Sequence, residues 1–176
     1  MRSTRTVEPC VLVIFGATGD LTQRKLLPAL YNLAIEQPLP PQFTVVGVAR
    51  RPVSDEQFRQ SALNSINQFS RRSPLNPQLW ETLSQGLFYC QSQLDDLQGY
   101  LRLKELLERL DRERGTLGNR IFYLATPPRY YAVIADLLSQ SGNARRGAAS
   151  GEGGWTRLIV EKPFGHDLAS ARALNI

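Results

Sequence analysis

The chain has 176 residues, 42% of them hydrophobic and 21% charged, and 21 basic against 16 acidic side chains give a net charge of +5. This composition predicts one soluble globular domain with its own core. The mild basic excess is spread along the chain, so we expect no nucleic-acid partner. Cys10 and Cys90 are too few for a disulfide framework, and no apolar run is long enough for a signal peptide or a membrane span. We therefore expect a cytoplasmic protein without a membrane partner.

Short β-rich runs alternate with helical patterns along the chain. Apolar residues at helical spacing predict helices around residues 26–34, 97–110 and 131–138. The runs that predict strands are Val11–Phe15, Phe43–Val48, Leu87–Cys90, Arg120–Ala125 and Arg157–Val160. This alternation predicts an α/β fold: a doubly wound, Rossmann-like parallel sheet in three layers, α/β/α.

Three segments have the composition of connections. Gln37–Pro41 and Ser70–Pro77 are predicted loops, and Ser141–Gly154, rich in Gly and Ser, is predicted to be a flexible insertion within the domain. The last residues predict a helix that begins near Asp167. We therefore expect the chain to be the front part of a longer protein.

The strongest local signal is VLVIFGATGDL, where a buried strand runs through two glycines into a helix. Such a turn lets the backbone approach a pyrophosphate at the helix N-terminus. Gly16 and Gly19 fill the second and third positions of G-x-G-x-x-G, but Ile14 occupies the first, so the match is partial. The alternative is a tight strand–helix turn without a ligand.

Three residues after the turn carry further expectations. Asp20 is predicted to cap the helix by accepting backbone N–H bonds, since its charge would repel a phosphate. Lys25 follows close enough to reach an anion held above the turn, although it could also belong to a solvated face. Pro28 is predicted to bend the helix or to lie near its start.

The second predicted strand is followed by Arg50 and Arg51. In a dinucleotide fold this point faces the adenosine ribose, where a carboxylate would bind the 2′-hydroxyl and an arginine suits a 2′-phosphate. No acidic residue follows the strand before Asp55. The pattern favours NADP over NAD; the alternative is a pair of surface arginines on a loop.

Two later strand ends also carry candidate residues. Pro127 and Pro128 form a rigid turn where open α/β sheets bind ligands, and Lys162 follows Glu161 at the end of the last predicted strand. Composition does not distinguish a catalytic Lys162 from an ion-paired one. His166, beside Asp167, is predicted to be a helix cap or exposed. Because His166 is the single histidine, a His-based metal site or a Ser-His-Asp triad would need residues from another chain. The sequence also contains no P-loop motif.

These segments together resemble the glucose-6-phosphate dehydrogenase family. The matching runs occur in that family's order and spacing and cover nearly the whole chain except the insertion at 146–154. They are FGATGDLTQRKLLPALYNL (15–33), VVGVAR (45–50), IFYLATPP (121–128) and WTRLIVEKPFGHDL (155–168).

The resemblance implies that residues 1–176 are the N-terminal NADP-binding domain of that family. It implies that the sugar phosphate of the substrate is contacted by Lys25, Lys162 and Pro163, with no metal. Coenzyme contacts are implied for Gly16, Ala17, Thr18, Gly19, Asp20, Leu21, Arg50, Gln93, Leu94, Pro127 and Lys162.

The family's reaction oxidises glucose 6-phosphate at C1 with NADP, in the pentose phosphate pathway, and the complete enzyme is expected to be a homo-oligomer. The family's catalytic histidine and its α+β substrate domain correspond to positions beyond Ile176, and His166 does not match that histidine. The chain alone is therefore expected to bind coenzyme without appreciable turnover. Two alternatives are another NADP-binding GATG-type reductase or sensor, and a truncated product without function.

Overall fold

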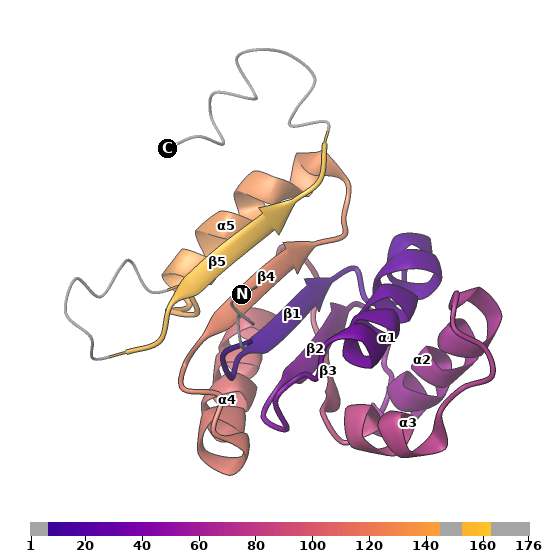
Figure 1. Cartoon of the computed structure of the whole chain (residues 1–176). Coiled ribbons are helices and arrows are strands. Elements are labelled where there is room, and N and C mark those ends of the chain that lie inside the picture. The colour runs from indigo at the N-terminus through magenta and orange to yellow at the C-terminus, as the bar shows by residue number, and fades with distance from the viewer. Residues whose placement is uncertain (1–6, 145–152, 163–176) are drawn as a thin grey trace.

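The computed structural model describes residues 7–144 and 153–162. Their strands form one parallel sheet in the order β3-β2-β1-β4-β5, with all arrows of Figure 1 pointing the same way. The strands are β1 (Val11–Phe15), β2 (Thr44–Ala49), β3 (Leu87–Gln91), β4 (Arg120–Leu124) and β5 (Thr156–Val160). The predicted strands and the parallel α/β fold are confirmed; β1 has the predicted bounds, and the ends of the other strands differ by at most one residue.

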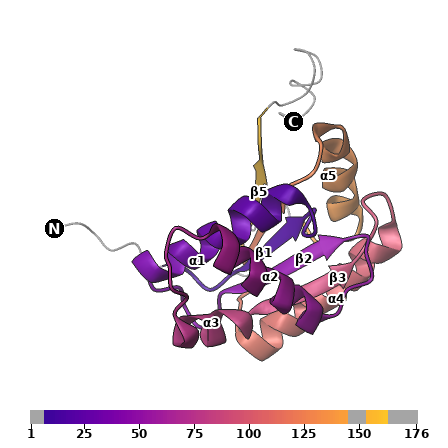
Figure 2. The ribbon, with the colours of Figure 1, turned by 90° about the vertical axis from the view of Figure 1, so that its right-hand side faces the viewer.

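Helices cover the sheet from both sides, so the predicted three layers are confirmed. Figure 2 shows α1, α2 and α3 on one side and α4 and α5 on the other. The helices are α1 (Leu27–Glu36), α2 (Asp55–Phe69), α3 (Pro77–Ser84), α4 (Leu97–Arg114) and α5 (Tyr131–Gln140), with the short helices η1 (Thr22–Leu26) and η2 (Pro128–Tyr130). The helical patterns around 26–34, 97–110 and 131–138 correspond to α1, α4 and α5.

Two helices were not predicted from the sequence. The helix α2 follows a capping box in which Ser54 accepts from the Gln57 N–H and Gln57 accepts from the Ser54 N–H. Pro77 was placed at the end of a loop, but it is the first residue of α3, where its missing N–H costs no hydrogen bond. The loops at 37–41 and 70–76 are confirmed. Most of the predicted insertion and the helix near Asp167 lie outside the described residues.

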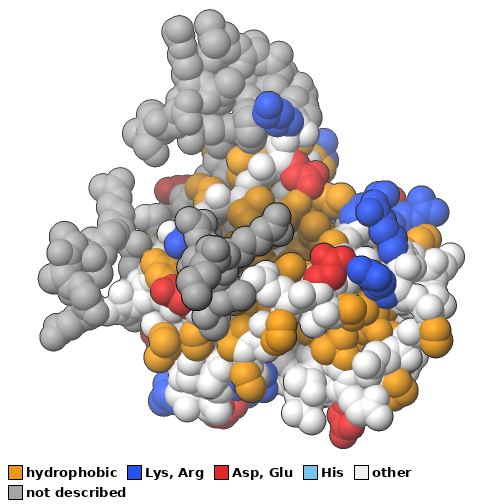
Figure 3. Space-filling model, viewed as in Figure 1, with side chains coloured by type: hydrophobic (Ala, Val, Ile, Leu, Met, Phe, Trp, Pro, Cys, Tyr) orange, Lys and Arg blue, Asp and Glu red, His pale blue; other side chains and the backbone are white. Residues whose placement is uncertain are grey.

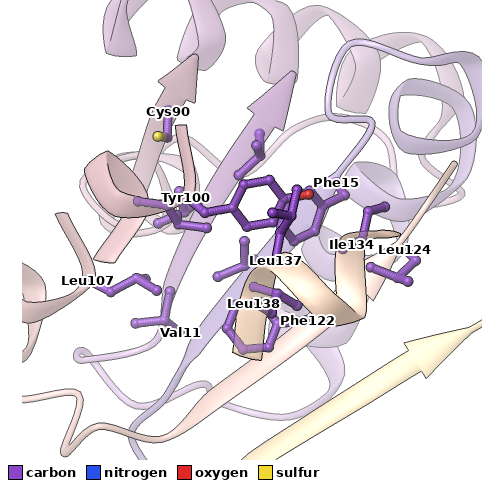
Figure 4. Packing of buried hydrophobic residues seen from close by; sticks show 14 of the residues in the cluster. Val11, Phe15, Cys90, Tyr100, Leu107, Phe122, Leu124, Ile134, Leu137 and Leu138 are labelled. Carbon is purple, nitrogen blue, oxygen red and sulfur yellow. The ribbon is translucent and has the colours of Figure 1, made fainter. Parts of the chain in front are cut away.

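The central strand β1 is buried along its whole length, because helices cover both of its faces. Figure 4 shows the core on the α4 and α5 side, where Phe15 and Tyr100 stack with ring centroids 5.6 Å apart. Phe122 of β4 and Ile134 of α5 pack into the same cluster. On the opposite side, Ile14 packs with Leu27 of α1 and Phe58 of α2. This double core fixes the strand ends that carry the candidate site.

The sheet is less well covered towards β5. Leu158 and Ile159 are 47% and 40% exposed. An apolar groove of about 340 Å³ runs along α1 and the strands β1, β4 and β5, and Figure 3 shows hydrophobic side chains gathered on this face. No helix among the described residues is long and apolar enough to cross a bilayer.

Candidate functional site at the carboxyl edge of the sheet

The glycine turn lies at the carboxyl end of β1, between the ends of β2 and β4. The N–H groups of Gly16 and Ala17 donate to the Val48 carbonyl at 2.9 and 3.1 Å. Gly16 has a φ of 85°, and a Cβ atom on it would lie 2.3 Å from the carbonyl oxygen of Ala125. Glycine is therefore required at this position by both backbone conformation and space.

The carbonyl groups of the turn are occupied from within the chain. Gly16 O accepts from the Gly19 N–H at 3.0 Å and from the Thr22 hydroxyl at 3.0 Å. The Gln23 side-chain amide donates to Ala17 O at 2.9 Å. By contrast, the Thr18 N–H donates to no acceptor within the described ranges, and the first N–H groups of a helix have none within the helix. Bound carbonyls and free N–H groups are the arrangement that accepts an anion.

The helix that follows begins with an irregular turn. Pro28 lies in the first turn of α1 and has no N–H, and the preceding residues form the π-helix η1, in which the Leu27 N–H donates to Thr22 O. The prediction that Pro28 lies near a helix start is confirmed for α1. The prediction that Asp20 caps the helix is wrong. Helical backbone already begins at Asp20, and its exposed carboxylate pairs with Arg24 at 3.4 Å.

Arg50 and Arg51 follow β2 at the same edge, and both side chains are exposed. Neither guanidinium forms an ion pair or a hydrogen bond with another described residue. The next carboxylate, Asp55, accepts a hydrogen bond from the Tyr89 N–H at 2.7 Å. It is therefore engaged with β3 rather than with the arginines. The turn offers two unneutralised cations and no competing carboxylate, as the prediction of a 2′-phosphate site requires.

The end of β3 brings Gln93 and Leu94 beside this turn, since β3 pairs with β2. The Gln93 side chain is exposed, and Leu94 is partly buried against the core on the α4 side. The Tyr100 hydroxyl donates to Leu94 O at 2.7 Å, which holds this segment against α4. The two residues thus lie at the edge where they were predicted.

The end of β4 presents Pro127, which is exposed, and Pro128, which begins η2. Between β4 and these prolines lies Thr126, whose hydroxyl oxygen is buried and has no hydrogen-bond partner among the described residues. Its methyl group borders Gly16. An unpaired polar atom beside the glycine turn fits a ligand-binding role. Sequence reasoning did not select Thr126, and its only signal was its position between a strand and two prolines.

The end of β5 presents Glu161 and Lys162, both exposed. Glu161 accepts from the Tyr123 hydroxyl, and its carbonyl accepts from the Tyr131 hydroxyl at 3.2 Å. Burial, aided by Glu161, raises the pKa of Tyr123 to about 12, so its hydroxyl keeps its proton at neutral pH. Lys162 has no ion pair within the described ranges, which leaves its ammonium available. Pro163, His166 and Asp167 lie outside those ranges.

Lys25 is exposed on η1 and has no ion pair with any residue that the structure describes. It lines an open groove of about 790 Å³ between α1 and the end of α2. Arg24, Arg71 and Arg72 also line this groove, and Figure 3 shows Lys and Arg side chains gathered on the side where α1 and α2 lie. Arg24 and Arg72 are paired with Asp20 and Glu36.

The glycine turn lies at the carboxyl edge of a parallel sheet, at the end of β1. This strand lies between β2 and β4, where the order of the strands reverses. Such an arrangement defines a Rossmann-like dinucleotide-binding domain. The family model described as "Glucose-6-phosphate dehydrogenase, NAD binding domain" matches residues 13–176. The chain belongs to the glucose-6-phosphate dehydrogenase family, and the resemblance predicted from the sequence motifs is confirmed.

Several relatives support this assignment. The chain is 51% identical over 99% of its length to glucose-6-phosphate 1-dehydrogenase of Chlamydia pneumoniae, and 46% identical over 99% to glucose-6-phosphate 1-dehydrogenase 2 of Mycobacterium bovis. A solved glucose-6-phosphate dehydrogenase in complex with glucose 6-phosphate superposes over 98% of the chain, with a TM-score of 0.79 at 32% identity. The chain spans about a third of each of these relatives, namely 34%, 33% and 34%.

Proposed function

We propose that this chain binds NADP along the carboxyl edge of its sheet. The pyrophosphate lies against the turn Gly16–Gly19 and the helix start at Asp20 and Leu21, and Arg50 holds the 2′-phosphate. Two observations carry the proposal. The Gly16 and Ala17 carbonyls of the turn are occupied while the Thr18 N–H has no acceptor among the described residues, and Arg50 is unpaired at the neighbouring strand end.

The remaining coenzyme contacts follow from the order of the strands. We place the adenine near Gln93 and Leu94 after β3, and the nicotinamide near Pro127 after β4. Lys162, whose ammonium has no described partner, is placed beside the nicotinamide and the substrate. The unpaired Thr126 hydroxyl supports a polar group of the coenzyme at the end of β4.

The activity we propose is that of the family, with this chain as the coenzyme-binding part of a longer protein. Glucose 6-phosphate is oxidised at C1 to the lactone, and the hydride passes to NADP. Lys25, Lys162 and Pro163 contact the sugar phosphate. The general base and an α+β substrate domain correspond to the two thirds of the relatives that this chain does not span. We further propose that the complete enzyme is a cytoplasmic homo-oligomer.

The role of Arg50 is tested by Arg50→Ala. We expect NADP binding to weaken by about 1.5–3 kcal/mol, the contribution of hydrogen bonds to a charged group, and NAD binding to change little. Titration calorimetry with both coenzymes measures this, with the exposed Arg112→Ala on α4 as the matched control. Equal losses for NADP and NAD would contradict the assignment. The NADP affinity of the double variant Arg50→Ala, Arg51→Ala, compared with that of Arg50→Ala, shows how much Arg51 contributes to binding the 2′-phosphate.

A second test concerns turnover by the chain alone. We expect the 176-residue polypeptide to bind NADP but to show no steady-state reduction of NADP with glucose 6-phosphate, because no general base for the C1 hydroxyl is assigned within it. The absorbance of NADPH measures the rate. A rate comparable to that of a complete enzyme would show that the base lies within this chain.

A further inference from the structure

The turn that carries Arg50 and Arg51 is held by β3 through its backbone. Three successive carbonyls, those of Ala49, Arg50 and Arg51, accept hydrogen bonds from β3 and the residue after it. The Ser92 N–H donates to Ala49 O at 3.0 Å, and the Gln91 side-chain amide donates to Arg50 O at 3.1 Å. The Tyr89 hydroxyl lies 2.7 Å from Arg51 O and 3.1 Å from Ala49 O. The hydroxyl has one proton, which is shared between the two carbonyls and so links the first and last residues of the turn.

Tyr89 is itself rigidly placed. The residue is 9% exposed, its ring centroid lies 5.6 Å from that of Phe58 in α2, and its N–H donates to the Asp55 carboxylate at 2.7 Å. Burial raises the pKa of Tyr89 to about 12, so the hydroxyl remains a donor at neutral pH. Gln91, in contrast, is exposed and has a less restricted side chain.

In this arrangement, different groups hold the turn in place and are available to bind a phosphate. The turn is fixed by its carbonyls, while both guanidinium groups stay free of partners among the described residues. Arginine loses considerable conformational freedom when it binds a phosphate, and a fixed backbone lowers that cost. The hydroxyl of Tyr89 fixes the backbone of this turn without contacting the phosphate or neutralising the two guanidinium charges.

We propose that Tyr89 is a positioning residue for the 2′-phosphate of the coenzyme, and that through the turn Ala49–Arg51 it sets the preference for NADP over NAD. The proposal rests on the proposed function. It extends the coenzyme site to a β3 side chain that acts through the arginines.

The test is Tyr89→Phe, which keeps the ring and removes the hydroxyl. We expect NADP to bind about threefold to tenfold more weakly, the effect of one net hydrogen bond, and the affinity for NAD to change less than twofold. Tyr31→Phe is the matched control, since it removes a buried hydroxyl that accepts from the Asn76 N–H in a different part of the fold. It should leave both affinities unchanged. Equal weakening of NADP and NAD, or no change in either, would overturn the proposal.

A double-mutant cycle separates positioning from general destabilisation. In a chain that already carries Arg50→Ala and Arg51→Ala, Tyr89→Phe should change NADP affinity less than twofold, because no cation remains to be positioned. If Tyr89→Phe weakens NADP binding threefold to tenfold in that variant as well, Tyr89 does not act through the arginines and the proposal is overturned. If the two arginine substitutions themselves leave the preference for NADP intact, the proposed function fails first, and the two failures are thereby distinguished.

Discussion

Replacing Gly16 by alanine is expected to lower the free energy of unfolding by about 2–5 kcal/mol and to abolish NADP binding in calorimetric titration. The left-handed conformation contributes about 1–2 kcal/mol of this loss and the crowded Cβ about 1–3 kcal/mol. The added Cβ would lie 2.3 Å from the Ala125 carbonyl oxygen and 3.1 Å from its carbon. Since these are backbone atoms of the β4 end, relief requires the turn or the strand to move. Either movement displaces the Thr18 N–H and the helix start, where we propose that the pyrophosphate binds.

Gly19→Ala is the control for this experiment. Gly19 does not adopt the left-handed conformation, and an added Cβ there would meet only Gly16 O, at 3.1 Å. Urea unfolding of both variants should therefore show a clearly smaller loss for Gly19→Ala. If Gly16→Ala unfolds like the unmodified chain and still binds NADP, the turn does not have the conformation described and the pyrophosphate site must be sought elsewhere.

Much of the fold was predictable because its central strands are covered on both faces. Such strands must be nearly continuous apolar runs, and VLVIF of β1 and TVVGVA of β2 are of this kind. The missed helix α2 buries only four residues, Phe58, Ala62, Ser65 and Ile66, and two of these are small or polar. Its apolar stripe is therefore limited to Phe58, Ala62 and Ile66 in a helix that is otherwise largely polar, and this weak pattern did not single it out. A capping box and packing against η1 support it instead, with Ser61 and Ser65 donating to Gln23.

Of the residues at the candidate site, some were selected from the sequence and others were missed or assigned wrongly. Gly16 and Arg50 were selected because the functions proposed for them depend on residue type at a strand end, which can be read directly from the sequence. Asp20 was assigned wrongly because the helix begins one residue early and Thr22 and Gln23 satisfy the turn. Thr126 is distinguished by the burial of an unpaired hydroxyl, and Tyr89 by hydrogen bonds to residues far away in the sequence. No local pattern reveals these, because the partners of Tyr89 lie 38 and 40 residues away.

The opposite, amino edge of the sheet supports a prediction of a different kind. Asp111→Ala is expected to lower the free energy of unfolding by about 3–5 kcal/mol, because it leaves a buried guanidinium without its charge partner. The Arg120 side chain is 3% exposed and pairs with Asp111 at 3.0 Å. Asp111 also accepts from the Thr116 hydroxyl and from the Gly118 N–H. One carboxylate therefore joins the end of α4 to the start of β4, and urea unfolding measures its contribution.

Two controls identify the unpaired charge as the cause. Asp136→Ala removes an exposed carboxylate that pairs with Gln140 on α5, and should change stability by at most about 0.5 kcal/mol. Replacing both partners, Asp111→Leu with Arg120→Met, should restore a large part of what Asp111→Ala loses, because no charge is then left buried. The Nε atom of Arg120 already lacks a partner among the described residues, so the native pair is itself imperfect. If the double replacement is as unstable as Asp111→Ala, the loss comes from the contacts of Asp111 with Thr116 and Gly118.

Because this network lies at the amino edge of the sheet and we propose that the coenzyme binds at the carboxyl edge, the NADP affinity of the folded variants should stay unchanged.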